Sequence, residues 1–312
     1  MRSELTRRGA LGIGVAALPL AGATEAKSTR KLPIGIATMQ FREYTNARLA
    51  KELSEQGFRI VQLFFTQTDS DYWKYGGRSD LPGMTPERAR EIAATYRSAG
   101  LSIHSMGVYT TLIHADAAER KANLAYFENM MKIGGQMGVR TFVSEAGHYQ
   151  PPGPAPAIPY DYQDDVWKMA VETVKDLARM AEAQGATVLL EPIYRSIFAT
   201  AKRTRVFLEE VGSPRVRALL DPANLLEAND LEEMFEQLHP WISCIHAKDR
   251  KLHVTTGVAA GQGDLDYRKL VTLAAKRTPG VPVILEYVGS SNYKEALEHL
   301  RNAIRLAGLR QA

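Results

Sequence analysis

Residues 242–249 read Ile-Ser-Cys-Ile-His-Ala-Lys-Asp, an apolar run that ends in His246, Lys248 and Asp249. Strands of a parallel sheet that is covered on both faces read as near-continuous apolar segments. Ionisable side chains are then expected where the strand leaves the core, because charged groups are rarely buried without a partner. This stretch therefore predicts a buried strand that delivers polar groups to its own carboxyl end.

Three other segments share this pattern. Residues 187–191 (TVLLE), 216–221 (VRALLD) and 281–286 (VPVILE) are each predominantly apolar until a terminal acid. The intervening segments have helical periodicity, so the pattern indicates successive strand–helix units. Counted along the whole chain, such units number eight, which favours a single (β/α)8 TIM barrel without a second domain.

The four strand ends carry three carboxylates and one imidazole, from Glu191, Asp221, His246 and Glu286. In a closed barrel the carboxyl ends of the strands converge on one mouth, so side chains from different strands can meet there. A single acid after a strand is more often a helix cap or a surface residue. Four in consecutive units, in the mixture that a divalent cation binds, favour a metal site.

The segments around these residues are LLEP, LLDPAN, CIHAKD and ILEY, and residues 261–266 read GQGDLD. They resemble the strand ends of the xylose isomerase-like barrels, specifically the sugar phosphate isomerase/epimerase family. The resemblance covers most of residues 27–312 and implies one catalytic barrel domain there. It is specific for the fold and weak for the substrate.

The resemblance implies proton transfer at a carbon beside a carbonyl, through an enediolate that a metal stabilises. It makes Glu191, Asp221, His246 and Glu286 the ligands of one divalent ion. Glu191 and Glu286 would also be the catalytic base and acid, on opposite sides of the substrate carbon. Mn²⁺, Mg²⁺ or Co²⁺ suits these oxygen ligands and one imidazole, and Zn²⁺ is an alternative.

Three further residues are candidate substrate contacts. Lys248 lies two residues beyond His246 and should point inward, where it could neutralise an oxyanion or hold a hydroxyl, unless it lies exposed at the rim. Asn224 stands where several sugar epimerases of the family have a substrate-binding histidine, which argues against ordinary ketose specificity. His104, in the expected strand 101–106, is either a substrate contact or a hydrogen-bonded structural histidine.

Two other activities and one binding function remain open from the sequence. A lyase or dehydratase could use the same site for β-elimination on a keto-sugar or a 3-keto-glycoside. A hydrolase of the AP endonuclease type would need further histidines, one of them at the place of Asn224. A non-catalytic sugar-binding barrel would keep the cavity without turning substrate over.

The charge distribution bears on the kind of partner. The 312 residues carry a net charge of +4 with dispersed lysines and arginines, so nucleic acid is not indicated and a small carbohydrate is the expected partner. The single cysteine, Cys244, cannot form an internal disulfide and is expected on the inward strand face with His246. The sequence gives no indication of oligomeric state.

Residues 1–26 resemble a twin-arginine export signal. Arg7 and Arg8 precede an apolar stretch over residues 10–20, and small residues follow at 21–23. The stretch is too short for a comfortable membrane span, although an uncleaved anchor is an alternative. We therefore expect export of a folded protein to the periplasm, the usual destination of this route, and no membrane contact after the signal is removed.

Overall fold

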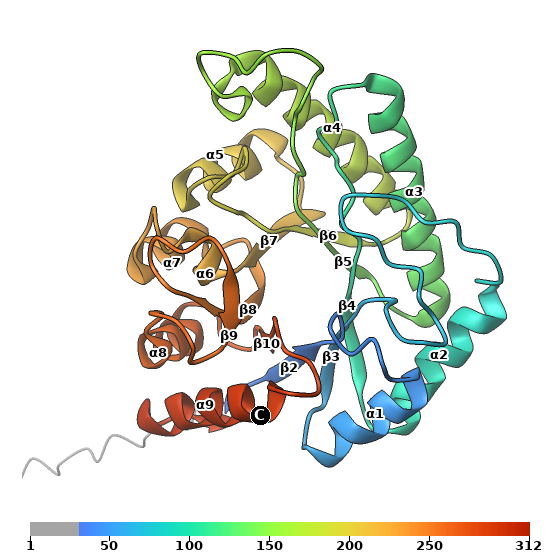
Figure 1. Ribbon diagram of the computed structural model, residues 1–312, viewed down its shortest axis with the longest axis vertical. Coiled ribbons are helices and arrows are strands. Elements are labelled where there is room, and N and C mark those ends of the chain that lie inside the picture. The colour runs from blue at the N-terminus through green and yellow to red at the C-terminus, as the bar shows by residue number, and fades with distance from the viewer. Residues whose placement is uncertain (1–30) are drawn as a thin grey trace, which may run out of the picture.

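The computed structural model describes residues 31–312, which form a closed parallel barrel surrounded by helices (Figure 1). The strand order is β10-β2-β3-β4-β5-β6-β7-β8, and β10 pairs with both β2 and β8. The ring therefore closes, and the expected (β/α)8 barrel is confirmed. The predicted export signal lies outside the described residues.

The barrel strands are short, and most are buried on both faces. They are β2 (Ile34–Ala37), β3 (Ile60–Leu63), β4 (Ser102–Gly107), β5 (Thr141–Ser144), β6 (Thr187–Leu190), β7 (Val216–Leu220), β8 (Ile242–Arg250) and β10 (Val283–Leu285). Outside the barrel, β1 (Lys31–Leu32) pairs with β11 (Arg310–Gln311).

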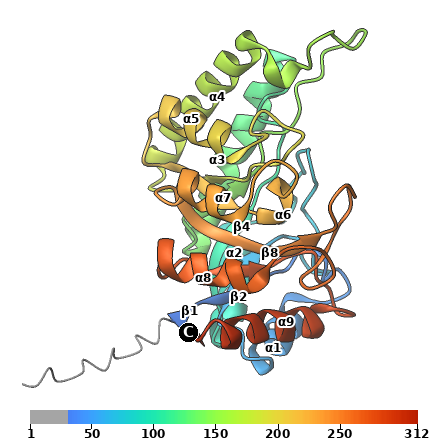
Figure 2. The same cartoon turned by 90° about the vertical axis from the view of Figure 1, so that its left-hand side faces the viewer.

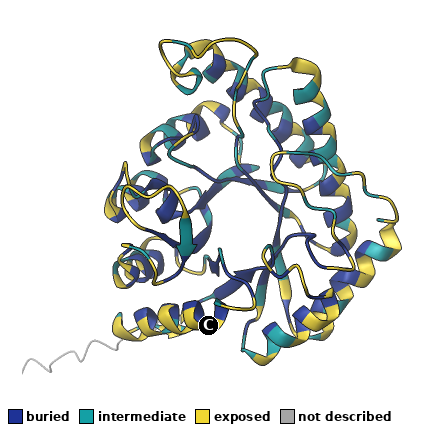
Figure 3. Cartoon of the chain, in the orientation of Figure 1, coloured by how far each residue is buried: buried dark blue, intermediate teal, exposed yellow. Residues whose placement is uncertain are grey.

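Helices follow the strands and bury one apolar face each against the barrel, with their outer faces exposed (Figure 3). They are α1 (Asn46–Glu55), α2 (Pro86–Ser98), α3 (Ala117–Met137), α4 (Asp164–Ala183), α5 (Ala201–Val211), α6 (Pro222–Leu225), α7 (Leu231–Leu238), α8 (Tyr267–Arg277) and α9 (Tyr293–Leu306), with a 3₁₀ turn η1 (Tyr160–Tyr162) before α4. None of the helices between residues 31 and 312 is both long enough and apolar enough to cross a membrane.

The start of helix α5 is set by its N-cap residue, Thr200. The apolar pattern places its start at Thr204, yet the helix begins at Ala201 because Thr200 accepts a hydrogen bond from the backbone N–H of Arg203. An N-cap hydroxyl of this kind satisfies one of the free amides of the first turn.

A small apolar cluster fills the inside of the barrel beneath its mouth. Cys244 is fully buried there, together with Leu189, Leu219 and Ile284 from neighbouring strands. Because side chains alternate along a strand, Cys244 and His246 share the inward face of β8. The barrel interior is therefore filled by apolar side chains, which lie directly beneath the polar residues of the mouth.

Strand β8 continues past the barrel and forms a hairpin with β9 (Gly257–Ala259), an element that the sequence did not predict. Figure 2 shows β8 running toward the side from which the long loops project. Asp249 fixes the hairpin, because its carboxylate accepts hydrogen bonds from the backbone N–H groups of Gly261 and Leu265. The extended strand carries Lys248 and Arg250 above the barrel mouth.

Candidate metal centre and substrate cavity

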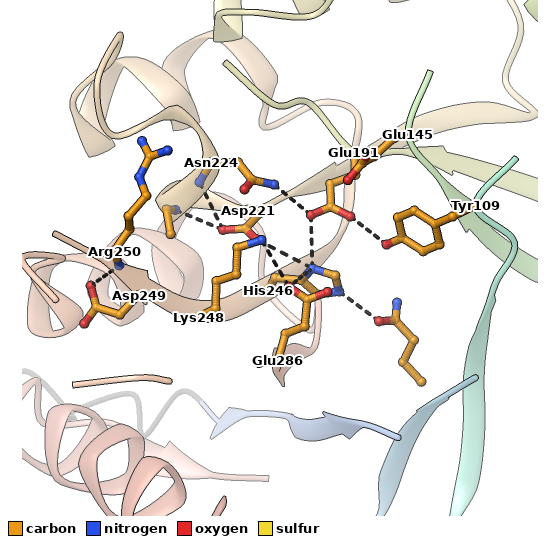
Figure 4. Close-up of polar contacts among 12 residues, drawn as sticks. Tyr109, Glu145, Glu191, Asp221, Asn224, His246, Lys248, Asp249, Arg250 and Glu286 are labelled. Carbon is orange, nitrogen blue, oxygen red and sulfur yellow. Dashed lines mark hydrogen bonds and ion pairs between the residues drawn. The ribbon is translucent and has the colours of Figure 1, made fainter. Parts of the chain in front are cut away.

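The four predicted metal ligands meet at the barrel mouth (Figure 4). Glu191, Asp221, His246 and Glu286 each offer one ligand atom, and these atoms lie within 4.8 Å of one another. The Nδ1 atom of His246 is 3.3 Å from Glu286 Oε2, 3.4 Å from Glu191 Oε1 and 3.9 Å from Asp221 Oδ2. All four side chains are buried. We call this group the cage.

A hydrogen-bonded pair of polar residues inside the barrel orients His246. Its Nε2 lies 2.9 Å from Oε1 of Gln62, whose Nε2 donates to Ser105 Oγ at 3.2 Å. Because an amide oxygen can only accept, His246 carries a proton on Nε2. Its Nδ1 therefore faces the cage, and this nitrogen would give up its proton to bind a metal ion there.

Hydrogen bonds also hold Glu191 and Asp221, the acids that directly follow β6 and β7. Tyr109 donates its hydroxyl to Glu191 Oε2 at 2.6 Å, and the side-chain amide of Asn224 donates to Glu191 Oε1 at 2.9 Å. Asp221 caps α6, because its Oδ1 accepts from the backbone N–H of Ala223 at 2.9 Å. Its second oxygen, Oδ2, is left facing the cage.

Three polar atoms of the cage have no hydrogen-bond partner among the described residues. They are Asp221 Oδ2, His246 Nδ1 and Glu286 Oε2, and all three are buried. Buried polar atoms are nearly always hydrogen-bonded, so three that converge on one point without such a bond form an arrangement that a bound cation would satisfy. Carboxylate oxygens with one imidazole nitrogen are a donor set that divalent cations bind. The residues therefore fit a divalent metal ion.

Lys248 places a positive charge beside the cage. Its Nζ lies 2.8 Å from Asp221 Oδ2, as an ion pair outside hydrogen-bonding geometry, and 3.3 Å from Glu286 Oε2. The same nitrogen lies 4.6 Å from the ring centre of Tyr287. Burial lowers the pKa of Lys248, but Asp221 and Glu286 outweigh burial and raise that pKa well above its usual value.

Burial and neighbouring charges also shift the pKa values of the acids and the histidine of the cage. Burial raises the pKa of Glu286, yet His246 and Lys248 outweigh burial and lower that pKa to about 2. Burial raises the pKa of Asp221 to about 6. For His246, burial lowers the pKa, but Glu286 and Glu191 raise it to about 10. The cage therefore stabilises positive charge at its centre.

A cavity of about 440 Å³ opens above the cage. Trp73, Tyr75 and Tyr109 line one wall, and their rings contact one another at centroid distances of 6.1–6.3 Å. The carboxyl of Glu145 lies on the same wall and accepts a 2.6 Å hydrogen bond from the Tyr75 hydroxyl. Burial, followed by the nearby charge of Glu191, raises the pKa of Glu145 to about 7.

The structure places two of the three candidate substrate contacts at the cavity. Lys248 and Asn224 line the cavity, together with the cage residues Glu191 and Glu286. His104 does not line it. The pairing of β4 with β3 skips His104, which lies between the paired residues 103 and 105, and its Nδ1 is 3.2 Å from Ser105 Oγ.

Several residues around the cage did not stand out in the sequence. Gln62 is a lone amide in an apolar strand, a signal that was available but has many structural explanations. Tyr109 follows its strand by two residues and gave no signal. Arg250 continues the alternation of His246 and Lys248, and could have been found by extending the strand one residue beyond Asp249.

Residues 50–303 match the family model described as xylose isomerase-like TIM barrel. The chain belongs to this family. The resemblance noted in the sequence is thereby confirmed at the level of the family. No curated protein matches this xylose isomerase-like barrel.

Solved structures with the same fold include enzymes of two reaction classes. D-psicose 3-epimerase from Clostridium cellulolyticum H10, solved with D-tagatose, is 17% identical, with a TM-score of 0.65 over 88% of this chain and 98% of its own. The probable 3-DHS dehydratase AsbF from Bacillus anthracis is 18% identical, with a TM-score of 0.68 over 88% of this chain and 99% of its own. A xylose isomerase-like protein from Mycobacterium smegmatis, in complex with magnesium, is 17% identical, with a TM-score of 0.61 over 89% and 97%. At these identities the likeness establishes the fold alone.

Proposed function

We propose that this chain is a divalent-metal-dependent isomerase or epimerase that acts on a carbohydrate by proton transfer beside a carbonyl group. The observation that carries the proposal is the set of three buried acids and one histidine whose ligand atoms meet in the cage, beneath a cavity of about 440 Å³. Proton abstraction beside a carbonyl is slow because negative charge develops on the carbonyl oxygen. A bound divalent cation would supply positive charge opposite that oxygen.

Glu191, Asp221, His246 and Glu286 would hold the ion, and two of them would also move protons. Glu191 and Glu286 come from the ends of β6 and β10, on different sides of the ring of strands, and both line the cavity. One carboxylate would remove the proton from the substrate carbon, and the other would return a proton to the opposite face. Epimerisation needs such access to both faces of one carbon.

The hydrogen bonds around Glu191 support its role as a positioned base. Tyr109 and Asn224 each donate to one of its oxygens, so the carboxylate has a fixed orientation. A catalytic base must be held within hydrogen-bond reach of the proton that it removes. Lys248 would hold a substrate hydroxyl or balance a developing negative charge, because its ammonium lies between the cage and the cavity.

The identity of the ion is proposed from ligand chemistry. Carboxylate oxygens and one imidazole suit Mn²⁺, Mg²⁺ or Co²⁺, with Zn²⁺ as an alternative. The magnesium complex of a protein with this fold supports a hard cation in such a barrel.

Glu145 favours β-elimination as a second candidate reaction. Its pKa of about 7 keeps part of the carboxyl protonated near neutral pH, and it lies in the cavity wall beside Tyr75. In an elimination, a cage glutamate would remove the proton beside the carbonyl, and the carbon–oxygen bond at the next carbon would break. Glu145 could then give its proton to the departing oxygen, so that water or an alcohol leaves.

Incubation of Mn²⁺-loaded protein in D₂O with D-fructose, D-psicose, D-tagatose and a 3-keto-glycoside separates these functions. Isomerisation or epimerisation predicts deuterium at the carbon beside the carbonyl and a recovered sugar of unchanged composition, as read by NMR and mass spectrometry. Elimination predicts an unsaturated product that has lost water or an alcohol. Neither exchange nor product with any compound of the panel would count against both reactions and favour a sugar-binding barrel.

We further propose that residues 1–26 direct export to the periplasm by the twin-arginine route. The support is the Arg7-Arg8 pair before an apolar stretch. Replacing both arginines by lysine should leave the protein in the cytoplasmic fraction, whereas unchanged export would refute the assignment.

A further inference from the structure

Arg250 is a buried arginine, and two of the three nitrogens of its guanidinium lack hydrogen-bond partners. The residue is 3% exposed, and its Nε and Nη2 atoms are buried without an acceptor among the described residues. Its guanidinium lies over the ring of Tyr194, whose centre is 4.3 Å from Cζ. Both residues line the cavity above the cage. Buried donors of a cation without acceptors are unfavourable, so the guanidinium is suited to bind an anionic partner.

Two other arginines, Arg203 and Arg42, have partners that Arg250 lacks. Arg203 donates to the backbone oxygens of Ile197 and Asp161. Arg42 also lines the cavity, but its guanidinium is exposed and lies 3.7 Å from Asp71 Oδ1. Arg250 therefore differs from an arginine that fastens loops and from one that forms a surface ion pair.

The hairpin fixes where the guanidinium lies. His246, Lys248 and Arg250 are alternate residues of β8, so their side chains leave the same face of the strand. Figure 4 shows Lys248 and Arg250 extending from β8 in a similar direction. Arg250 pairs with Gly257 of β9, and its backbone N–H donates to the Asp249 carboxylate. The cavity thus has the cage at its base, Lys248 above it and Arg250 farther along the strand.

We propose that Arg250 binds a carboxylate at the end of the substrate that is remote from the reacting carbon, which makes the substrate a sugar acid. This inference rests on the proposed function, because it assumes that the hydroxy-carbonyl end of the substrate lies at the cage. A guanidinium fork matches a carboxylate with two parallel hydrogen bonds. Lys248 lies between the substrate carboxylate and the acidic cage, where its charge reduces their repulsion.

A phosphate shares this oxyanion chemistry but has less support here. Phosphate sites commonly add free backbone N–H groups to their basic side chains. The first amides of α6, beside the cavity, are those of Ala223 and Asn224, and both donate to Asp221 Oδ1. These α6 amides are therefore not available to a phosphate, which favours the planar carboxylate.

Calorimetry on the Mn²⁺-loaded full chain, with D-fructose, D-fructuronate and D-fructose 6-phosphate, tests the inference. The three compounds differ at carbon six, which carries a hydroxyl, a carboxylate or a phosphate. We expect D-fructuronate to bind at least about tenfold more tightly than D-fructose, as a charge-assisted bidentate pair implies. Equal affinities for these two would overturn the inference, and tighter binding of the phosphate than of the carboxylate would overturn the choice of carboxylate.

The variant Arg250→Met removes the fork but keeps much of the side-chain length. It should abolish the preference, so that D-fructuronate and D-fructose bind to the variant within about twofold of each other, because the charge-assisted pair is lost. Arg42→Met is the matched control and should retain the preference. A preference that survives in a folded Arg250→Met protein would refute the role of Arg250. If that variant does not fold, Arg250→Lys serves instead, and it should weaken the preference by losing the bidentate geometry.

These outcomes are distinguishable from failure of the proposed function. Calorimetry compares the affinities for the three compounds, whereas proton exchange in D₂O reports the chemical step and does not compare affinities. Exchange on neutral sugars with no preference for the acid would remove only the inference about Arg250. A preference for the acid that depends on Arg250, with no exchange on any substrate, would remove only the isomerase.

Discussion

The ammonium nitrogen of Lys248 lies 2.8 Å from Oδ2 of Asp221, within the buried group of acids at the barrel mouth. Both side chains are nearly inaccessible to solvent, so water cannot screen this ion pair. Lys248 therefore balances part of the negative charge of the cage by itself. A bound divalent cation would take over that role, which couples Lys248 to metal binding.

We predict that Lys248→Met destabilises the metal-free protein more than the metal-loaded protein. Removing one partner of a buried ion pair costs about 3–5 kcal/mol, because the remaining charge is left buried and unpaired. Thermal unfolding in EDTA should therefore show a clear loss, and excess Mn²⁺ should recover most of it. Lys251→Met, at an exposed position on the same hairpin, is the control and should behave as wild type. Equal losses with and without metal would contradict the coupling.

His246→Ala should lose the metal. The Nδ1 atom of His246 faces all three carboxylates of the cage, so its removal takes away the one nitrogen ligand. Elemental analysis of the purified wild type should give about one divalent ion per chain, and the variant should retain only a trace after the same dialysis. His104→Ala is the matched control and should keep its metal, because His104 lies outside the cavity lining. A folded wild type without metal after soaking in Mn²⁺ would refute the site.

Gln62→Leu should weaken metal binding without removing a ligand. Gln62 accepts from Nε2 of His246 and thereby holds its ring and tautomer. Loss of such a supporting hydrogen bond typically lowers metal affinity by roughly 10–100-fold. Titration of the apo-protein with Mn²⁺, followed by calorimetry, measures the change. An unchanged affinity would mean that packing alone orients the imidazole.

Glu191→Gln and Glu286→Gln should each abolish most turnover. An amide keeps the size of the side chain and one oxygen, but it cannot take up a proton from carbon. Loss of a positioned base typically lowers the rate by about 10²–10⁴-fold. The rate of deuterium exchange at the substrate carbon is the measurement, with metal content determined on the same samples. Near-normal exchange in either metal-loaded variant would remove the mechanism that uses two glutamates.

The barrel and the cage could be predicted from the sequence because both follow from one periodic pattern. Apolar strands that end in Glu191, Asp221, His246 and Glu286 specify strand ends, and barrel closure then brings those ends together. The strand that carries His246 is longer than predicted. The charged residues Lys248 and Asp249 indicated the end of a strand, whereas in the structure the strand continues through them into a hairpin. Arg250 was missed for the same reason.

Side-chain partners were the part that sequence patterns could not supply. The contact between Tyr109 and Glu191 joins two strand ends through a loop whose path depends on tertiary packing. His104 shows the opposite case, because a register shift between β3 and β4 changes which side chains follow the alternation. A one-residue irregularity of this kind leaves no signature in the apolar pattern.

Glu145 makes the folded state sensitive to pH in a direction that can be measured. Burial raises its pKa from the usual 4.5 to about 7, so between these values the folded protein binds the proton more tightly than the unfolded chain does. The free energy of unfolding therefore falls as pH rises through this window. The hydrogen bond from Tyr75 opposes the shift, because it favours the ionised carboxylate.

Glu145→Gln should remove this pH dependence. The amide does not ionise, yet its oxygen can still accept from Tyr75, so the variant should gain stability relative to wild type as pH rises from about 4.5 to about 8. The gain should be on the order of 2–3 kcal/mol, since one pKa unit corresponds to about 1.4 kcal/mol. Urea unfolding at a series of pH values in EDTA measures the difference, and the titration of the other acids cancels in the comparison. Tyr75→Phe should keep the pH dependence and move it to higher pH, because the bond that favours the carboxylate is lost. A constant difference between Glu145→Gln and wild type across the range would show that Glu145 is ionised throughout and could not serve as a proton donor to a leaving group.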